Sequence, residues 1–366
     1  MRVEAAVLRA ADGPYTLEPL DLADPGPGEL VVRIAGTGLC HTDLLGRAPG
    51  DRVAKPVVLG HEGAGTVEAV GPGVSLKPGT PVVLSFDSCG ACPNCRAALP
   101  GNCAQMAARN MYSLPLDGVP RLKDASGNAV NNRWFGQSSF ATHALTTTAN
   151  TVPIPPDVPL ALMGPLGCGM QTGAGSVLIS LGVRAGDGIA VFGAGAVGLA
   201  AVMAARLAGA AQIIAVDLNP ARLALAAELG ATHTLHGADE DLPKRIRSIS
   251  GGEGVQYCLD TTAVPEVVAT AVAALRTTGV CALAGVGSRP YALDPTLLLM
   301  GRTVKGVIEG DAVPHLFIPR LVELWRQGRF PFDRLIETYP LKDIGRAEAD
   351  VLAGRTVKPV LLPEAP

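Results

Sequence analysis

Four of the eight cysteines of the chain are concentrated in one short stretch, "CGACPNCRAALPGNC", at residues 89–103. The spacing is C-x2-C-x2-C-x7-C, and its members are Cys89, Cys92, Cys95 and Cys103. Four thiolates so close in sequence can form a closed tetrahedral shell around zinc, with no position left for a substrate. The spacing therefore predicts a structural zinc site in a lobe at 85–115. An iron–sulfur cluster is the rival metal site, and a disulfide pair is the metal-free alternative.

A second, dispersed set of metal-binding types consists of Cys40 in "GLCHTDL", His61 in "LGHEGAG" and Cys168 in "GPLGCGMQTGAG". Two cysteines and one histidine leave one position of a tetrahedral zinc ion open, as a catalytic site requires. On ligand type alone the alternative stays open, because the cysteines could be buried thiols and His61 a hydrogen-bonded loop residue.

A glycine-rich turn is the third chemical motif, in "IAVFGAGAVGLAA". An apolar run ends in G-x-G-x-x-G (Gly193, Gly195 and Gly198), a helical stretch follows, and a second apolar run ends at Asp217. This order is typical of dinucleotide binding: the glycines permit a tight turn, the approach of a pyrophosphate and close helix packing. Asp217 would accept hydrogen bonds from ribose hydroxyls and repel a 2′-phosphate, which predicts NAD rather than NADP. An ordinary buried βαβ unit is the alternative.

The elements around this turn alternate between helix and strand over about 170–308, which predicts a doubly wound parallel sheet. We expect a helix and a strand on either side of a break at Gly279, and Cys258 and Cys281 as packing residues of buried strands. Residues 189–216 are apolar enough to suggest a membrane span, but their glycines and Arg206 favour a strand, a turn, a buried helix and a strand.

The composition limits the classes of function. The 366 residues are 48% apolar and 17% charged, which allows two domains and excludes global disorder. The formal net charge of −3 argues against binding to nucleic acid or to an anionic membrane. The N-terminal residues show no export signal, so we expect a cytoplasmic protein, in which clustered thiols bind metal more often than they form disulfides.

Several motifs together resemble those of the zinc-dependent medium-chain alcohol dehydrogenases. The resemblance covers nearly the whole chain and is carried, in order, by "GLCHTD", "GHEGAG", the four-cysteine lobe, "GPLGCGMQTGAG" and "VFGAGAVGLAA". Within that family, "FGQSSFATHAL", "GCGMQTGAG" and "VIEGD" resemble the aryl-alcohol (benzyl-alcohol) dehydrogenase branch.

The resemblance implies an α/β architecture with a GroES-like, β-rich catalytic domain at 1–169 and 309–366. A Rossmann domain with a doubly wound parallel sheet would be inserted at 170–308. It also implies a homo-oligomer, dimer or tetramer. The apolar stretches 280–287 and 292–310 are candidates for the shared surface, with ordinary burial as the alternative.

By the same resemblance, Cys40, His61 and Cys168 ligate a catalytic zinc, and Thr42 passes on the alcohol proton. Asp43 and Glu62 lie behind the metal, although either could be a surface charge.

Several residues would contact the cofactor: His41 and Lys358 at the pyrophosphate, Arg222 at the adenosine ribose, and Thr172 and Val286 at the nicotinamide. A solvated side chain is the alternative for Lys358 and Arg222. Phe140 would line the substrate pocket or lie in the core. Leu45 departs from the family, because many relatives have a histidine there that ends the proton relay.

These features predict an enzyme with two zinc ions per chain, one catalytic and one structural. It would oxidise a primary, benzylic or allylic, alcohol reversibly to its aldehyde, with NAD as the hydride acceptor. A relative acting on aliphatic or terpenoid alcohols, or on thiol–formaldehyde adducts, is the alternative within the same class. A non-catalytic, zinc-stapled nucleic-acid-binding or regulatory protein is the alternative of another class, which the few basic residues at 85–115 argue against.

Overall fold

The computed structural model describes residues 1–48, 53–287 and 289–363. The chain divides into two compact units, which are considered separately. Unit 1 comprises Met1–Cys168, Val313–Val322 and Asp333–Pro366, and unit 2 comprises Gly169–Ala312 and Glu323–Phe332. The short return of residues 323–332 to unit 2 has no signal in the sequence.

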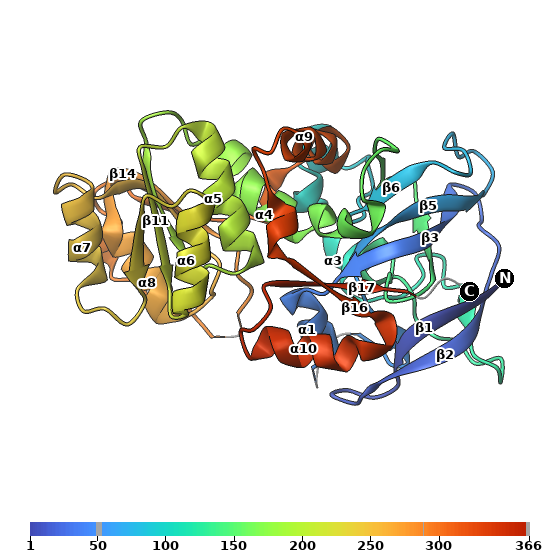
Figure 1. Cartoon of the computed structure of the whole chain (residues 1–366). Coiled ribbons are helices and arrows are strands. Elements are labelled where there is room, and N and C mark those ends of the chain that lie inside the picture. The colour runs from blue at the N-terminus through green and yellow to red at the C-terminus, as the bar shows by residue number, and fades with distance from the viewer. Residues whose placement is uncertain (49–52, 288, 364–366) are drawn as a thin grey trace. The chain divides into compact units, whose positions relative to one another are not determined.

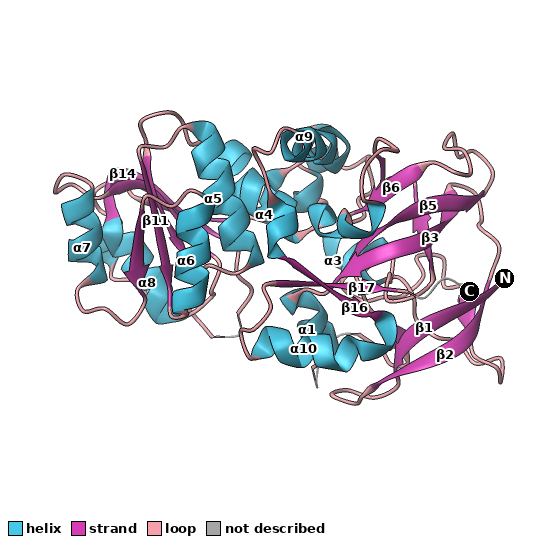
Figure 2. Ribbon diagram, in the orientation of Figure 1, coloured by secondary structure: helices cyan, strands magenta, loops and turns pink. Residues whose placement is uncertain are grey.

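Unit 1 is built on two β-sheets (Figures 1 and 2). The larger has the strand order β16-β17-β3-β5-β6-β9, with β8 paired to β3, and the smaller has the order β4-β1-β2-β7. The strands are β1 (Arg2–Leu8), β2 (Tyr15–Leu22), β3 (Glu29–Gly38), β4 (Val57–Val58), β5 (Glu62–Val70), β6 (Pro81–Leu84), β7 (Leu122–Lys123), β8 (His143–Thr147), β9 (Thr151–Pro153), β16 (Ile336–Pro340) and β17 (Lys358–Leu362). The helices are α1 (His41–Arg47), α2 (Pro93–Arg96), α3 (Met106–Asn110), α10 (Ile344–Leu352) and, up to Val322, α9 (Pro314–Arg326).

Unit 2 is a six-stranded parallel sheet with the order β12-β11-β10-β13-β14-β15. Helices α5 and α6 lie on one face, and α7 and α8 lie on the other (Figure 2). The strands are β10 (Gly188–Phe192), β11 (Gln212–Asp217), β12 (His233–His236), β13 (Val255–Asp260), β14 (Leu275–Leu283) and β15 (Thr303–Gly306). The helices are α4 (Gly169–Gly175), α5 (Ala196–Ala208), α6 (Pro220–Leu229), α7 (Leu242–Ile249) and α8 (Pro265–Ala274). The predicted doubly wound sheet is confirmed.

The helices of unit 2 begin and end where the local sequence favours it. Helix α6 starts at Pro220, which needs no N–H partner there, and the side chain of Asn219 accepts the N–H groups of Ala221 and Arg222. Helix α5 ends at Ala208, and the next residue, Gly209, caps it with a φ of 77°, a left-handed conformation that glycine adopts at little cost.

Two details of unit 2 test the sequence-based expectations. Cys258 and Cys281 are register partners on β13 and β14 and are fully buried, so their predicted packing role is confirmed. The expected break at Gly279 is wrong, because α8 ends at Ala274, β14 begins at Leu275, and Gly279 lies inside that strand. There the pairing of β14 with β13 shifts its register, so the extra residues are absorbed within the strand.

The apolar stretch 189–216 forms β10, α5 and most of β11. Its helix is too short for a bilayer, and among the described residues we find no helix with the length and hydropathy that a membrane span needs. The strand–turn–helix–strand interpretation of this stretch is therefore confirmed.

We predict that Gly198→Ala destabilises the protein by about 1–3 kcal/mol, as overpacking does. A Cβ atom at Gly198 would collide with the carbonyl oxygen of Gly193, which is backbone and cannot rotate away. Urea unfolding gives the free energy of unfolding, and Gly195→Ala is the matched control. A Cβ atom at Gly195 would meet no heavy atom within 4 Å, so its cost should stay below about 0.5 kcal/mol. Equal stabilities of the two variants would contradict the prediction.

Candidate metal centre and dinucleotide-binding turn

The centre of the larger sheet brings Cys40 and His61 together. Strands β3 and β5 are antiparallel, and Gly38 at the end of β3 pairs with Glu62 at the start of β5. Cys40, two residues beyond β3, and His61, one residue before β5, therefore meet at the same edge of the sheet.

Cys168 reaches this edge from a separate part of the chain. It follows a 3-10 turn, Gly164–Gly167, that lies against the start of β5. A Cβ atom at Gly164 would collide with the carbonyl oxygen of Glu62, so only glycine permits this approach. The ligand atoms of Cys40, His61, Glu62 and Cys168 all lie within 4.8 Å of one another. The structure thus brings the three predicted ligands together.

The side chains of this cluster have the chemistry of a zinc site. Within the described residues, Nε2 of His61 is buried and makes no hydrogen bond, so its lone pair is available to a metal ion. A hydrogen bond from the neighbouring thiol of Cys168, aided by the charge of Lys358, holds the pKa of Cys40 well below its usual value. The thiolate, which is the form that binds metal, is therefore favoured. Two sulfurs and one nitrogen fit zinc with one position left for a substrate.

Asp43 orients the imidazole of His61. Its Oδ1 lies 2.8 Å from Nδ1 of His61 and also accepts the backbone N–H of Gly60 at 3.1 Å and the indole N–H of Trp134 at 3.0 Å. Its Oδ2 accepts the N–H of Cys40 at 3.0 Å. Because the bond to a carboxylate keeps one ring proton on Nδ1, Nε2 is the nitrogen that can bind a metal ion at the cluster. Asp43 is fully buried, so the surface alternative for this residue is excluded.

Glu62 and Lys358 form a buried ion pair beside the cluster. Nζ of Lys358 donates to both carboxylate oxygens of Glu62 at 2.9 Å and to the carbonyl oxygen of Leu39 at 3.3 Å. Burial lowers the pKa of Lys358, but the carboxylate of Glu62 outweighs it and the pKa is raised, so the lysine stays charged. Burial has the opposite effect on Glu62, whose pKa it raises. The expected phosphate contact of Lys358 is not what the structure shows, since its three N–H groups are directed at these acceptors and the side chain is buried.

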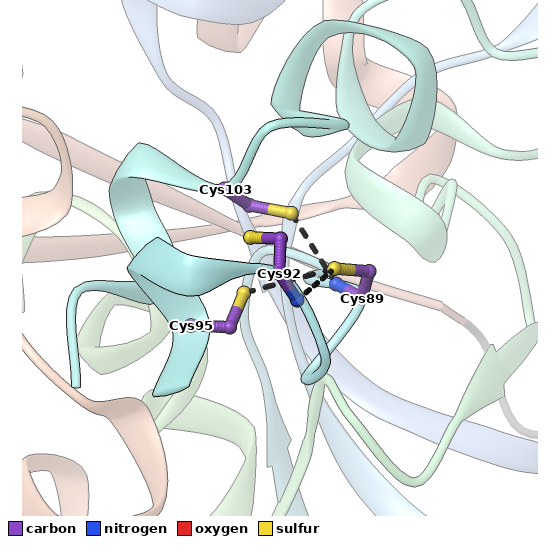
Figure 3. A group of neighbouring side chains, drawn as sticks. All are labelled: Cys89, Cys92, Cys95 and Cys103. Carbon is purple, nitrogen blue, oxygen red and sulfur yellow. Dashed lines mark hydrogen bonds between the residues drawn. The ribbon is translucent and has the colours of Figure 1, made fainter. Parts of the chain in front are cut away.

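The four cysteines of the lobe converge on one point (Figure 3). Sγ of Cys89 lies 3.9 Å from Sγ of Cys95, and tetrahedral zinc with Zn–S bonds of about 2.3 Å requires S–S separations of about 3.8 Å. Among the described residues, which include every cysteine, there is no disulfide. Sulfur atoms within 4.8 Å of one another leave room for a single ion rather than a multi-iron cluster.

Backbone N–H groups of the lobe point at the sulfurs. Cys89 Sγ accepts the N–H of Cys92 at 3.3 Å, and Cys92 Sγ accepts that of Ala104 at 3.5 Å. The bond from Ala104 is the main reason why the pKa of Cys92 falls to about 6, whereas burial raises the pKa of Cys95 to about 12. Such N–H···S bonds disperse the negative charge that a four-thiolate shell would carry.

In unit 2 the three glycines of the turn each occupy a position that excludes or restricts a side chain. Gly193 has φ 91°, which favours glycine, and Gly198 lies against the carbonyl oxygen of Gly193. The Cβ position of Gly195 faces open space at the N-terminus of the 13-residue helix α5. Its backbone could therefore be approached by an anionic group.

Asp217 is held beside this turn at the end of β11. Its Oδ2 accepts the N–H of Ala194 at 2.6 Å, and its Oδ1 accepts that of Asn219 at 2.8 Å. Asp217 and Gly193 of the turn border on a cavity of about 390 Å³, whose lining also includes Leu218, Gly237, Thr262 and Val264. The cavity lies at the carboxyl ends of the parallel strands, where doubly wound sheets bind ligands.

Comparison with known proteins identifies the family. Residues 26–156 match the sequence family described as "Alcohol dehydrogenase GroES-like domain", and residues 196–325 match "Zinc-binding dehydrogenase". The geraniol dehydrogenase of Castellaniella defragrans is 45% identical over 98% of this chain and 97% of its own. The chain belongs to the zinc-dependent medium-chain alcohol dehydrogenases.

Solved structures of this dehydrogenase family have the same fold. An alcohol dehydrogenase zinc-binding domain protein from Burkholderia ambifaria has 49% identity and a TM-score of 0.97. The benzyl alcohol dehydrogenase of Acinetobacter calcoaceticus has 40% identity and a TM-score of 0.95, and in both cases the similarity covers 100% of each chain. The predicted combination of a GroES-like β-rich domain and a Rossmann domain is thereby confirmed.

The other residues that this dehydrogenase was predicted to use have different surroundings. In unit 1, His41 is exposed at the start of α1, and Oγ1 of Thr42 lies 3.8 Å from Sγ of Cys40. Leu45 is 46% exposed and apolar, so it cannot relay a proton. Phe140 is fully buried and packs edge-on against Tyr15, with ring centroids 6.2 Å apart, so it is a core residue and not a pocket wall.

In unit 2, three predicted cofactor contacts have different environments. Thr172 is nearly buried in α4 and donates to Oε2 of Glu309 at 3.4 Å. Val286 is 72% exposed. Arg222 lies in the first turn of α6, and its buried Nε makes no hydrogen bond with any described residue. Their contacts with a cofactor stay predictions.

Sequence reasoning missed three residues of the dehydrogenase that touch the His61–Asp43 pair. Besides the Trp134 bond to Asp43, the ring of Phe135 stacks on His61 with centroids 4.5 Å apart, and Nε2 of Gln137 donates to the carbonyl oxygen of His61 at 2.8 Å. The available signal was a cluster of large and amide side chains in "RWFGQSS", a loop with no helical or strand period.

We predict that Asp43→Asn weakens zinc retention by about 10- to 100-fold, as loss of a carboxylate behind a ligand histidine does. The amide nitrogen would face N–H donors in place of one carboxylate oxygen. Zinc per chain after dialysis against graded chelator concentrations measures the effect. Asp21→Asn is the control, because Asp21 lies in the same unit, is 57% exposed and pairs only at the surface with Arg2. Equal retention by both variants would contradict the role of Asp43.

Proposed function

We propose that this chain is an NAD-dependent alcohol dehydrogenase that oxidises a primary benzylic or allylic alcohol reversibly to its aldehyde. The observation that carries the proposal is the cluster of Cys40, His61 and Cys168, whose donor atoms suit a zinc ion with an open position. The relatives named geraniol dehydrogenase and benzyl alcohol dehydrogenase support an allylic or benzylic substrate.

When bound, zinc would act as a Lewis acid that makes the alcohol proton easier to remove, and NAD would accept the hydride. The residues of the chain supply position and proton transfer. Asp43 keeps the proton of His61 on Nδ1 and the lone pair of Nε2 directed at the cluster. Thr42, which is half-buried and beside Cys40, would accept the alcohol proton at Oγ1. Leu45 is apolar, so the relay cannot continue from Thr42 through the side chain at that position.

The second metal and the cofactor belong to the same proposal. The four-cysteine lobe would hold a second, structural zinc, because its sulfurs fit one ion and offer no open position. In unit 2, the open space at Gly195 would admit the pyrophosphate at the start of α5, and Asp217 would bind the ribose hydroxyls.

We further propose that the protein works as a homo-oligomer on a small-molecule substrate in the cytoplasm, without nucleic acid or membrane. The stretches 280–287 and 292–310 support self-association, because Val286, Leu299 and Met300 are 72%, 77% and 57% exposed despite their apolar character. Membership of the dehydrogenase family favours an enzyme over the non-catalytic alternative.

We predict that Cys40→Ala abolishes NADH formation from benzyl alcohol or geraniol, lowering kcat/KM by at least about 1000-fold, because a metal ligand is lost. NADH absorbance at several alcohol concentrations measures the rate. Cys281→Ala, the same change at a buried cysteine of unit 2, should keep activity within about threefold at a temperature where the variant is folded. Unchanged turnover in Cys40→Ala would remove the metal from the chemistry. Aliphatic alcohols and formaldehyde with a thiol, tested in parallel, separate the other substrate classes.

We predict that Asp217→Asn lowers the ratio of kcat/KM with NAD to kcat/KM with NADP by about tenfold or more, equivalent to about 1.4 kcal/mol. The change removes the charge that would repel a 2′-phosphate and keeps one acceptor oxygen at the end of β11. Asp239→Asn in the same unit is the control, since Asp239 pairs with Arg245 near the surface. A ratio that stays at its original value would show that Asp217 does not select the cofactor.

A further inference from the structure

Residues 133–137, the bridging segment, contact His61 and Asp43 of one metal-binding group and Asp87 at the base of the four-cysteine lobe. The segment belongs to a loop between β7 and β8 and is buried throughout: Arg133, Trp134, Phe135 and Gln137 are at most 4% exposed. A buried arginine in a loop requires acceptors, and a buried loop requires partners for its backbone. The guanidinium of Arg133 pairs with Asp87 at 3.3 Å and with Glu29 at 3.9 Å. The backbone of the segment is hydrogen-bonded by the side chains of Ser113, Ser138 and Asn150.

One set of side chains in the bridging segment holds the His61–Asp43 pair. Trp134 donates its indole N–H to Oδ1 of Asp43, and the ring of Phe135 stacks on the imidazole of His61 at 29°. The amide of Gln137 spans the start of β5, donating to the carbonyl oxygen of His61 at 2.8 Å and accepting the N–H of Gly63 at 3.0 Å. The bridging segment therefore contacts His61 in three ways. It packs on the face of the imidazole, it donates to the backbone carbonyl, and it reaches Nδ1 indirectly through Asp43.

The remaining side chain of the segment reaches the base of the four-cysteine lobe. Nη2 of Arg133 donates to Oδ2 of Asp87 at 3.3 Å, and Asp87 lies two residues before Cys89. Gly136 lies so close that a Cβ atom would approach Cβ of Asp87 to 2.9 Å. Asp87 is fully buried, so its carboxylate depends on these neighbours.

Asp87 also joins the two ends of the lobe. Its backbone N–H donates to Oδ1 of Asn110 at 2.8 Å, and Nδ2 of Asn110 donates back to its carbonyl oxygen at 2.9 Å. Oδ2 accepts a second guanidinium, that of Arg109, at 2.9 Å. Residues that precede and follow the four cysteines thus meet at the carboxylate that Arg133 contacts.

The backbone of the bridging segment is strained. Phe135 has φ 50° and Ser138, just beyond the segment, has φ 49°, both in the left-handed region that residues with a Cβ atom disfavour. Such a conformation persists only where the surroundings enforce it. Contacts on both sides surround it here, so we expect the segment to relax when its contacts at the lobe are lost.

We propose that the bridging segment couples the two metal sites: the four-cysteine lobe, through Asp87 and Arg133, holds Trp134 and Phe135 against Asp43 and His61. Arg133 and Trp134 are positioning residues, because they act through Asp87 and Asp43 and contact no ligand sulfur. Loosening the lobe is then expected to weaken metal retention at Cys40, His61 and Cys168. The inference rests on the proposed zinc ion at those three residues.

The first test follows zinc release from the holoprotein to a chromogenic chelator. Cys40→Ser identifies which kinetic phase belongs to the Cys40–His61–Cys168 site, since that phase disappears. Arg133→Met is expected to accelerate this phase about tenfold or more, the lower end of the effect of supporting contacts on metal affinity. Arg133→Lys, which keeps the charge, should give an intermediate rate. An unchanged phase in folded Arg133→Met protein would overturn the proposal.

Coupling itself is tested by a double-mutant cycle. Cys92→Ser loosens the lobe without touching the bridging segment, and it should accelerate release from the Cys40–His61–Cys168 site about tenfold in the otherwise unchanged chain. In the Arg133→Met background the same change should add less than about twofold. Equal factors in both backgrounds would show that Arg133 does not carry the coupling, which would overturn the proposal.

If Arg133→Met fails to fold, a milder pair of variants tests whether the bridging segment supports the metal site at His61. Trp134→Phe removes the N–H that Asp43 accepts, and Trp325→Phe is the same change at the other tryptophan, in unit 2. With Co2+ bound, Trp134→Phe should shift the visible absorption of the ion at His61 and speed its release, and Trp325→Phe should do neither. Identical behaviour of the pair would overturn the inference. Absence of metal at this site in the unmodified chain would instead overturn the proposed function, and the inference with it.

Discussion

The buried carboxylate of Asp43 is the group on which the arrangement of the metal-binding side chains depends. An unpaired carboxylate without contact to water would be costly, and Asp43 avoids that cost by accepting hydrogen bonds from His61, Gly60, Trp134 and Cys40. These donors come from the start of α1, the approach to β5 and a loop far along the chain. The carboxylate therefore links three segments while it sets the tautomer of the imidazole.

The sheet behind this carboxylate explains why the ligands can be so far apart in sequence. Antiparallel pairing of β3 with β5 determines the position of Cys40 relative to His61, and the close approach of Gly164 to Glu62 determines the position of Cys168. In unit 2 the glycine-rich turn is held by close contact between the backbones of Gly198 and Gly193. Gly195 is the glycine of this turn whose Cβ position faces open space. In both units, glycine is needed where two backbone segments approach more closely than a Cβ atom allows.

The parts of the site that could be predicted from the sequence are those set by residue type and short spacing. Four cysteines within one short stretch and a glycine-rich turn between strand and helix have few physical interpretations, and the doubly wound sheet followed from alternating apolar runs. The partners of Lys358 could not be predicted, because they depend on β17 lying beside β3 in the folded sheet. The roles of Trp134 and Phe135 depend on a loop conformation with a left-handed residue, which no periodicity reveals. For the same reason the sequence could not show that Phe135 stacks on His61 whereas Phe140, five residues later, lies in the core.

The strand order of the larger sheet has a consequence for how the protein is made. Cys40, His61 and Cys168 all precede unit 2 in the chain, whereas β16 and β17, which complete the sheet beside β3, follow it. During synthesis on the ribosome the three side chains therefore emerge before the lysine that neutralises Glu62 has been translated. Until β17 is added, Glu62 lacks the positive charge of Lys358, so the electrostatics of the incomplete site differ from those of the complete fold.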